Sequence, residues 1–143
     1  MQVDFHTGLA DKLPFACRLL RKALRAGHRV VVTGDPVQLA RLDQLLWTFD
    51  PGEFIPHVRL RAGEQPVPRL ARTPLWLADQ PADAGTCDVL VNLGPAALGD
   101  APLPARTLEL VARTDDEVAA GRHRWRAHVA AGRTPVNHPQ ADA

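Results

Sequence analysis

The chain has 143 residues, of which 45% are hydrophobic, and a formal net charge of +1. This length suits a single domain with its own hydrophobic core. The near-neutral charge argues against a protein that binds nucleic acid through an overall basic surface. No apolar run approaches the ~20 residues that a membrane-spanning helix needs, so we expect a cytoplasmic protein without a membrane partner.

The first half of the chain alternates predicted strands and predicted helices. Alternating polarity in MQVDFHTG predicts a short strand at residues 1–8. Apolar residues at helical spacing predict a helix over 11–27, and the β-branched run that follows predicts a strand at 29–34, buried on both faces. Asp35 and Pro36 then predict the start of a second helix, as its N-cap and first-turn proline.

The second half begins with an irregular part rich in Pro and Gly and continues with further strands and a last helix. The expected strands are an edge strand near 54–60 and core strands at 74–79, 87–94 and 107–113. Thr114 and Glu117 predict a capping box at the start of the last helix, which we expect to end near Gly132. Residues 135–143 show no periodicity, so we expect one domain over 1–134 and a flexible C-terminal tail over 135–143.

This alternation of strands and helices predicts an α/β fold with a mostly parallel sheet. The turn TGDP after the second strand is where a nucleotide-binding fold would place its phosphate loop. It contains only Gly34 instead of G-x-G-x-x-G, and no G-x-x-x-x-G-K-[ST] occurs in the chain. Pro36 also lacks a backbone N–H that could face a phosphate. We therefore expect no nucleotide-binding loop and no cofactor.

Residues suited to catalysis or metal binding form no recognisable arrangement. The six histidines show neither i, i+4 pairing nor a cysteine at metal-ligand spacing. The chain contains no serine, and Cys17 and Cys87 lie in apolar segments without the polar surroundings of an activated thiol. Helix capping explains the adjacent carboxylates at 115–117. The sequence predicts a protein that is not an enzyme, without catalytic, cofactor or metal residues.

Two aromatic features remain, and the first is LLWTFDPGEF at residues 45–54. Its aromatic side chains could close the end of a helix against the core. Alternatively, Trp47 and Phe54 form an exposed patch that contacts a protein partner, because Trp and Phe are common interface anchors. The sequence leaves both possibilities open.

The second feature is AAGRHRWRAHVAAGR, residues 119–133. Helical spacing places apolar residues and two arginines on one face. That face consists of Val118, Arg122, Trp125, Arg126 and Val129, while Arg124 and His128 lie on a neighbouring face. Such a stripe suits an acidic ligand with an aromatic group better than a nucleic-acid backbone. Alternatively, Trp125 packs in the core and the arginines are solvated.

The ordered segments resemble the chi subunit family of bacterial DNA polymerase III over most of the chain. The most specific of them are KLPFACRLLRKALRAGHRVVV, LDQLLWTFDPGEFIPH, DVLVNLG and RWRAHVAAGR. The resemblance implies a single-domain, Rossmann-like three-layer sandwich without nucleotide-binding activity. It also implies a non-catalytic accessory subunit of the replicative holoenzyme.

Chi proteins bind the acidic C-terminal tail of single-stranded DNA-binding protein, which ends in a run of Asp followed by Ile-Pro-Phe. The resemblance implies that Val111 lines the pocket for the terminal Phe and that Arg122 pairs with the terminal carboxylate. It further implies that Trp125 packs on the Phe ring, with Arg126 as a nearby cation.

One position departs from the pattern implied by the resemblance. Some family members carry a lysine one helical turn before Arg122, where this chain has Val118. Arg113 or Arg124 could supply the missing charge. We expect weaker ionic steering of the tail but not a loss of recognition.

In the family, a psi subunit connects chi to the clamp loader. Trp47 and Phe54 are candidates for a second contact, with psi or with a helicase. The resemblance thus implies a replisome-associated protein that bridges single-stranded DNA-binding protein to the clamp loader and reaches DNA only indirectly. The alternative is a module that binds single-stranded nucleic acid directly through its basic helix faces.

Overall fold

The computed structural model describes residues 1–52, 54–100 and 102–140. The strands are β1 (Gln2–Leu9), β2 (Val30–Thr33), β3 (Val58–Leu60), β4 (Leu75–Ala78), β5 (Val89–Asn92), β6 (Arg106–Ala112) and β7 (Val136–Pro139). The helices are α1 (Lys12–Arg25), α2 (Pro36–Thr48) and α3 (Asp115–Ala130), with short 3₁₀ helices at Pro68–Leu70 and Pro81–Ala84. Among the described helices, none combines the length and apolar character needed to cross a membrane.

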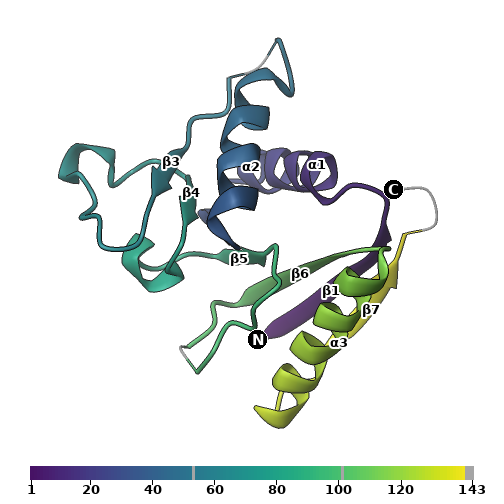
Figure 1. Ribbon diagram of the computed structural model, residues 1–143. Helices are drawn as coiled ribbons and strands as arrows, with labels where there is room; N and C mark the ends of the chain where they lie inside the picture. Colours follow the sequence, from purple (N-terminus) through teal and green to yellow (C-terminus); the bar gives the residue numbers. More distant parts are fainter. Residues whose placement is uncertain (53, 101, 141–143) are drawn as a thin grey trace.

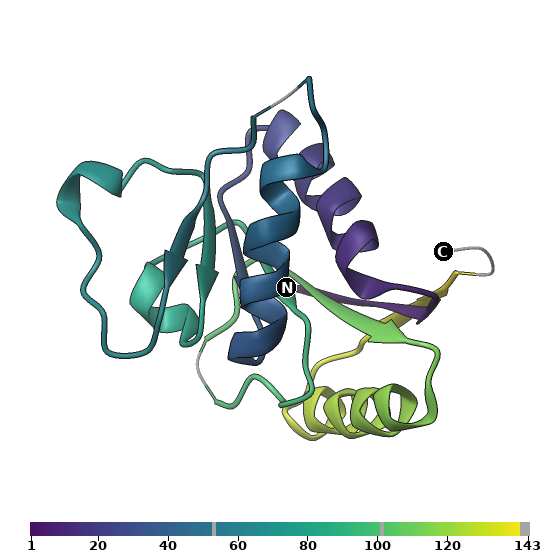
Figure 2. The ribbon, with the colours of Figure 1, turned by 45° about the horizontal axis from the view of Figure 1, so that its top comes forward.

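The seven strands form a single sheet in the order β3-β4-β2-β5-β6-β1-β7, and each described pairing is parallel (Figure 1). Helices α1 and α2 lie on one face of this sheet, and α3 lies on the other (Figure 2). The prediction of a Rossmann-like three-layer α/β sandwich is therefore confirmed.

The central strands are apolar on both sides because both faces are covered. Val30 and Val32 belong to the main core under α1 and α2. Val31, between them, packs on the opposite face with Trp76 and Leu90. This arrangement explains the continuous β-branched run that predicted a buried strand.

The first two helices begin at aspartates that act as N-caps. Asp11 Oδ1 accepts a hydrogen bond from Leu13 N at 3.2 Å, and Asp35 Oδ1 accepts one from Gln38 N at 3.0 Å. Both contacts satisfy amides of the first helical turn. The predicted start of α2 at Asp35 and Pro36 is therefore confirmed.

The capping box predicted for α3 is wrong. Thr114 occupies the N-cap position, but its side chain makes no cap hydrogen bond to any described residue. Glu117 Oε1 instead accepts from Ala112 N at 3.1 Å and lies 2.9 Å from Lys12 Nζ. Lys12 of α1 thus forms an ion pair with the Glu117 carboxylate, which we had expected to cap α3.

The prediction of a flexible tail from residue 135 is wrong for Val136–Pro139, which forms β7 at the edge of the sheet. Strand β7 pairs with β1, and Gln140 N donates to Thr7 O at 2.8 Å. All four residues of β7 are exposed, so no hydrophobic alternation marks the strand in the sequence. The sheet therefore extends beyond residue 134, while residues 141–143 lie outside the described part.

Candidate functional site

A pocket of about 350 Å³ lies between α3 and the strands at one end of the sheet. It is lined by Phe5, Thr7 and Gly8 of β1, Val111 of β6, Val118, Gly121, Arg122 and Trp125 of α3, and Asn137 of β7. Arg122 is the only charged residue among these described lining residues. The pocket therefore combines apolar walls with one exposed cation.

Gly121 allows α3 to pack directly against β6. A Cβ atom at this position would lie 2.8 Å from Cγ1 and 2.9 Å from Cγ2 of Val111. Carbon atoms do not pack this closely, so a side chain at position 121 would push the helix away from the strand. The missing side chain thus sets the distance between the two elements that hold Val111 and Arg122.

Trp125 lines the pocket and also packs on the sheet. Its ring centroid lies 5.0 Å from that of Phe5, and the two ring planes are inclined by 59°. Phe5 is buried, whereas Trp125 is only partly buried. The two roles considered for Trp125 from the sequence, core packing and a place in a binding surface, are therefore compatible.

The structure brings three of the four predicted ligand-binding residues of this region together. Val111, Arg122 and Trp125 line the pocket. Arg126 is exposed and does not belong to the described lining. Its charge can therefore influence a ligand only from the surface around the pocket.

Arg124 and His128 lie on the face of α3 that packs against the sheet. Arg124 Nε donates to Glu109 Oε1 at 2.8 Å, and His128 Nε2 lies 2.7 Å from Glu109 Oε2. Arg133 Nε donates to His128 Nδ1 at 2.9 Å. Because Nδ1 accepts this hydrogen bond, His128 carries its proton on Nε2 and donates it to Glu109.

This network corrects the expectation that Arg124 could supply the charge missing at Val118. Arg124 is 0% exposed, and Glu109 already neutralises its charge. The guanidinium therefore cannot reach a ligand at the surface. Arg113, the other candidate, follows β6 and is exposed.

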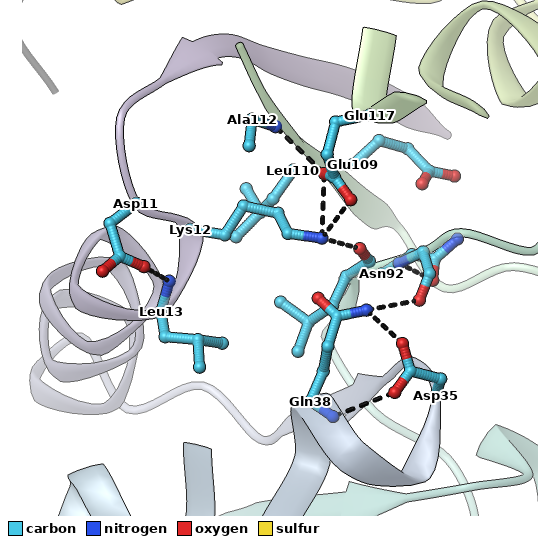
Figure 3. Close-up of polar contacts among 12 residues, drawn as sticks. Asp11, Lys12, Leu13, Asp35, Gln38, Asn92, Glu109, Leu110, Ala112 and Glu117 are labelled. Carbon is cyan, nitrogen blue, oxygen red and sulfur yellow. Dashed lines mark hydrogen bonds and ion pairs between the residues drawn. The ribbon is translucent and has the colours of Figure 1, made fainter. Parts of the chain in front are cut away.

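A second region lies at the carboxyl ends of the central strands, where open α/β sheets commonly bind ligands. Side chains from three helices cross this region (Figure 3). Lys12 Nζ donates to Leu93 O at 2.7 Å and lies 2.9 Å from Glu117 Oε1. Gln38 Nε2 donates to Asp35 Oδ2 at 2.6 Å. Lys12 thus joins α1 to α3 and to the end of β5, and Gln38 joins α2 to the adjacent residue by donating from Nε2 to Gly94 O at 3.0 Å.

Trp47 and Phe54 form an exposed aromatic patch, which we call the Trp47 patch. They are 56% and 64% exposed, and their ring centroids lie 5.3 Å apart. The ring of His57 lies 5.2 Å from that of Trp47 and is anchored by Asp43, whose Oδ1 is 2.7 Å from His57 Nε2. Phe49, by contrast, packs against the main core. Closure of the core therefore involves Phe49, while the Trp47 patch remains open.

The two cysteines differ from activated thiols. Burial raises the pKa of the Cys17 thiol to about 11, and burial also raises the pKa of Cys87. Both thiols are therefore mostly protonated near neutral pH, whereas the thiolate is the nucleophile. Within the described part of the chain, no group of three His, Cys, Asp or Glu residues is placed to hold a metal ion.

The sequence reasoning missed five residues of the pocket lining, which are Phe5, Thr7, Gly8, Gly121 and Asn137. Phe5 and Thr7 could have been found, because alternation along β1 places both on the same face of the sheet. Gly121 carries no pattern of its own, since its importance depends on the close approach of Val111. Asn137 was overlooked because its segment was expected to be flexible.

The family model described as DNA polymerase III chi subunit, HolC, matches residues 1–135. The DNA polymerase III subunit chi of Pseudomonas aeruginosa is 35% identical over 131 residues, which cover 87% of this chain and 87% of that protein. The probable DNA polymerase III subunit chi of Rickettsia prowazekii is 29% identical over 92 residues, covering 64% of this chain and 53% of that protein.

Proposed function

Because the chain belongs to the DNA polymerase III chi subunit family, we propose that its pocket between α3 and the sheet binds the acidic C-terminal tail of single-stranded DNA-binding protein. The protein acts as a non-catalytic accessory subunit of the bacterial replicative holoenzyme. It works in the cytoplasm at the replisome and contacts DNA only through its partners.

The observation that carries this proposal is an apolar pocket with Arg122 beside it. A terminal Phe offers both a hydrophobic ring and a carboxylate. Burial of the ring against Trp125 and Val111 contributes roughly 1.5–3 kcal/mol before ordering costs. A charge-assisted bond from Arg122 to the carboxylate contributes about 1.5–3 kcal/mol. Together these two terms amount to about 3–6 kcal/mol, which corresponds to a weak affinity, from millimolar to on the order of tens of micromolar.

Val118 lines the pocket where some family members have lysine. This replacement removes a cation that would attract the run of Asp in the tail, but it adds apolar surface for the Phe. Recognition of the terminal residue is retained, while long-range attraction depends on Arg122 and Arg126. The affinity therefore falls with increasing salt, because ions screen exposed charges.

A titration with two synthetic peptides tests this function. One peptide carries a run of Asp followed by Ile-Pro-Phe, and the other lacks the terminal Phe. We expect the first to bind and the second to bind at least tenfold more weakly. Equal binding of both peptides would contradict the proposal.

Two arginine variants localise the binding. Arg122→Ala removes the cation beside the pocket and weakens the Phe-ending peptide about tenfold or more. Arg72→Ala removes an exposed arginine outside the pocket and serves as the charge-matched control. Equal losses in the two variants would point to nonspecific attraction of an acidic peptide.

The exposure of the Trp47 patch favours a second protein contact. Trp47 and Phe54 are large, exposed and close together, which are properties of interface anchors. Through this patch the protein binds a psi-type subunit, which connects it to the clamp loader, or a helicase. Co-purification of such a partner with the native protein, and its loss with Trp47→Ala, tests this contact.

The alternative function, direct binding of single-stranded nucleic acid, makes a different prediction. It requires binding of a naked oligonucleotide with a steep dependence on salt. The buried position of Arg124 reduces the number of cations that α3 presents to such a ligand. A gel shift at low salt that shows binding as tight as the peptide's would favour this alternative.

A further inference from the structure

Strand β7 forms part of the pocket although it follows residues 1–135, where the family match ends. We infer that Asn137 of β7 is a ligand-binding residue, whose side-chain amide binds the C-terminal carboxylate of the peptide together with Arg122. This inference rests on the proposed function. It deepens that function by assigning half of the carboxylate site to a strand outside the family match.

The position of Asn137 follows from the register of β7 on β1. Asn137 is paired with Phe5, and His138 is paired with His6. Because side chains alternate between faces, Asn137 points to the same side as Phe5 and Thr7, towards α3. The ring of His138 stacks instead on His6, on the opposite face, with centroids 5.2 Å apart. The pocket lining includes Asn137 for this reason.

The orientation of the amide is set by a neighbour on β1. Thr7 Oγ1 donates a hydrogen bond to Asn137 Oδ1 at 2.8 Å. The oxygen of the amide is thus occupied, and the nitrogen with its two N–H groups has no acceptor among the described residues. An amide held in this way keeps both N–H donors for a ligand, which suits a carboxylate.

The charges around the pocket favour the same ligand group. No described lining residue is acidic, and Arg122 provides the positive charge. Arg122 approaches from α3, whereas Asn137 approaches from β7, with Phe5 and Trp125 also in the lining. Donors on two walls can hold the two oxygens of a terminal carboxylate while the hydrophobic side chain enters the apolar part. An internal carboxylate of an Asp lacks the adjoining hydrophobic side chain.

Addition of the peptide as an eighth strand is a competing mode, and the edge of β7 opposes it. Gln140 N donates to Thr7 O, so by alternation the peptide groups of Val136 and His138 also face β1. The residues whose backbone groups face away from β1, where an eighth strand would pair, are then Asn137 and Pro139. Pro139 has no N–H, and prolines are typical of edge strands that do not pair further. Recognition by the Asn137 side chain is therefore favoured over backbone pairing.

Replacement of Asn137 by Asp tests the inference with little change in shape. The variant keeps an oxygen for Thr7 but exchanges the N–H donors for a second oxygen and a negative charge. We expect Asn137→Asp to weaken binding of the Phe-ending peptide at least tenfold. Asn137→Ala, which adds no charge, weakens it in the same direction, about threefold or more. Either change lowers the affinity for the same peptide with an amidated C-terminus by a smaller factor.

Gln140→Glu provides the matched control, because it makes the same amide-to-carboxylate change three residues further on, outside the described lining. Its affinity for the Phe-ending peptide stays within about twofold of the native value. Thermal unfolding of each variant reports whether β7 is retained. If Asn137→Asp unfolds, the comparison is made with Asn137→Ala alone.

The outcomes separate this inference from the proposed function. Native protein that binds the Phe-ending peptide and loses affinity in Arg122→Ala, but not in either Asn137 variant, overturns the role of Asn137 and leaves the function intact. Equal losses for the free-acid and amidated peptides also overturn it, because the amide would then not act on the carboxylate. If the native protein does not bind the Phe-ending peptide, both the proposed function and the role of Asn137 are overturned.

Discussion

Arg124 and Glu109 form an ion pair in which both side chains are 0% exposed and Nε lies 2.8 Å from Oε1. The pair joins the middle of α3 to β6, and a further hydrogen bond runs from Arg124 Nη2 to Leu110 O at 2.8 Å. Two residues away on the same helix, Arg122 is exposed in the pocket. The two arginines therefore differ in role. Arg124 holds α3 against β6, whereas Arg122 is exposed to solvent and accessible to a ligand.

Arg124→Ala is expected to lower the free energy of unfolding by roughly 3–5 kcal/mol, because it leaves the carboxylate of Glu109 buried without its cation. Arg122→Ala is the matched control and changes stability by about 0.5 kcal/mol or less, as is typical of an exposed side chain. Urea unfolding monitored by tryptophan fluorescence measures both. Similar unfolding midpoints for the two variants would show that the buried pair does not stabilise the fold.

Gly121→Ala tests the close packing of α3 on β6. Alanine is favoured over glycine in a helix by roughly 0.5–1 kcal/mol, so a helix without tertiary constraints would become more stable. Contact of the new Cβ with Val111 at 2.8 Å opposes this gain. We expect a net loss of about 1–3 kcal/mol in unfolding free energy and weaker binding of the Phe-ending peptide. An increase in stability would mean that the helix shifts freely.

The main elements of the fold could be predicted from the sequence because their patterns are local. The run around Val31 predicted a strand buried on both faces, and Asp35 with Pro36 predicted the start of α2. Each pattern depends on neighbours within one or two turns of chain. The order of the strands and the placement of α3 on the opposite face depend on contacts between distant segments.

The candidate site was predictable only in part for the same reason. Helical spacing grouped Arg122 with Trp125 and set Arg124 apart, but it could not show that Arg124 meets Glu109 inside the protein. Asn137 was missed because β7 is short and exposed, and its partner is β1 at the other end of the chain. The pairing with β1 determines the structure of β7, so the sequence of β7 shows no hydrophobic pattern.

Acidification is expected to destabilise the protein through His6. Burial lowers the pKa of His6, and the neighbouring His138 adds to this effect, while Asp4 opposes it. The unfolded state therefore binds a proton at His6 more readily than the folded state does. The contribution of His6 to stability is present above its unfolded pKa of 6.5 and is lost as the pH falls through the lowered folded value.

Urea unfolding at pH 7.5 and pH 5.5 measures this dependence. The urea midpoint of the native protein decreases from pH 7.5 to pH 5.5. It decreases less in His6→Gln, because glutamine does not titrate in this range. His6 stacks on His138 between β1 and β7, so the loss of stability begins at the edge strand. An equal pH dependence in the two proteins would assign the effect to other groups.

Substitution in the Trp47 patch is expected to separate the two contacts of the protein. The patch belongs to the end of α2 and the following loop, and α2 lies on the face of the sheet opposite α3 (Figure 2). Trp47→Ala and Phe54→Ala therefore leave affinity for the Phe-ending peptide within about twofold and change stability by about 1 kcal/mol or less, because both side chains are largely exposed. In a co-purification experiment, the same variants lose the psi-type partner, whereas Arg122→Ala retains it. A joint loss of peptide and partner in Trp47→Ala would show that the two surfaces are not independent.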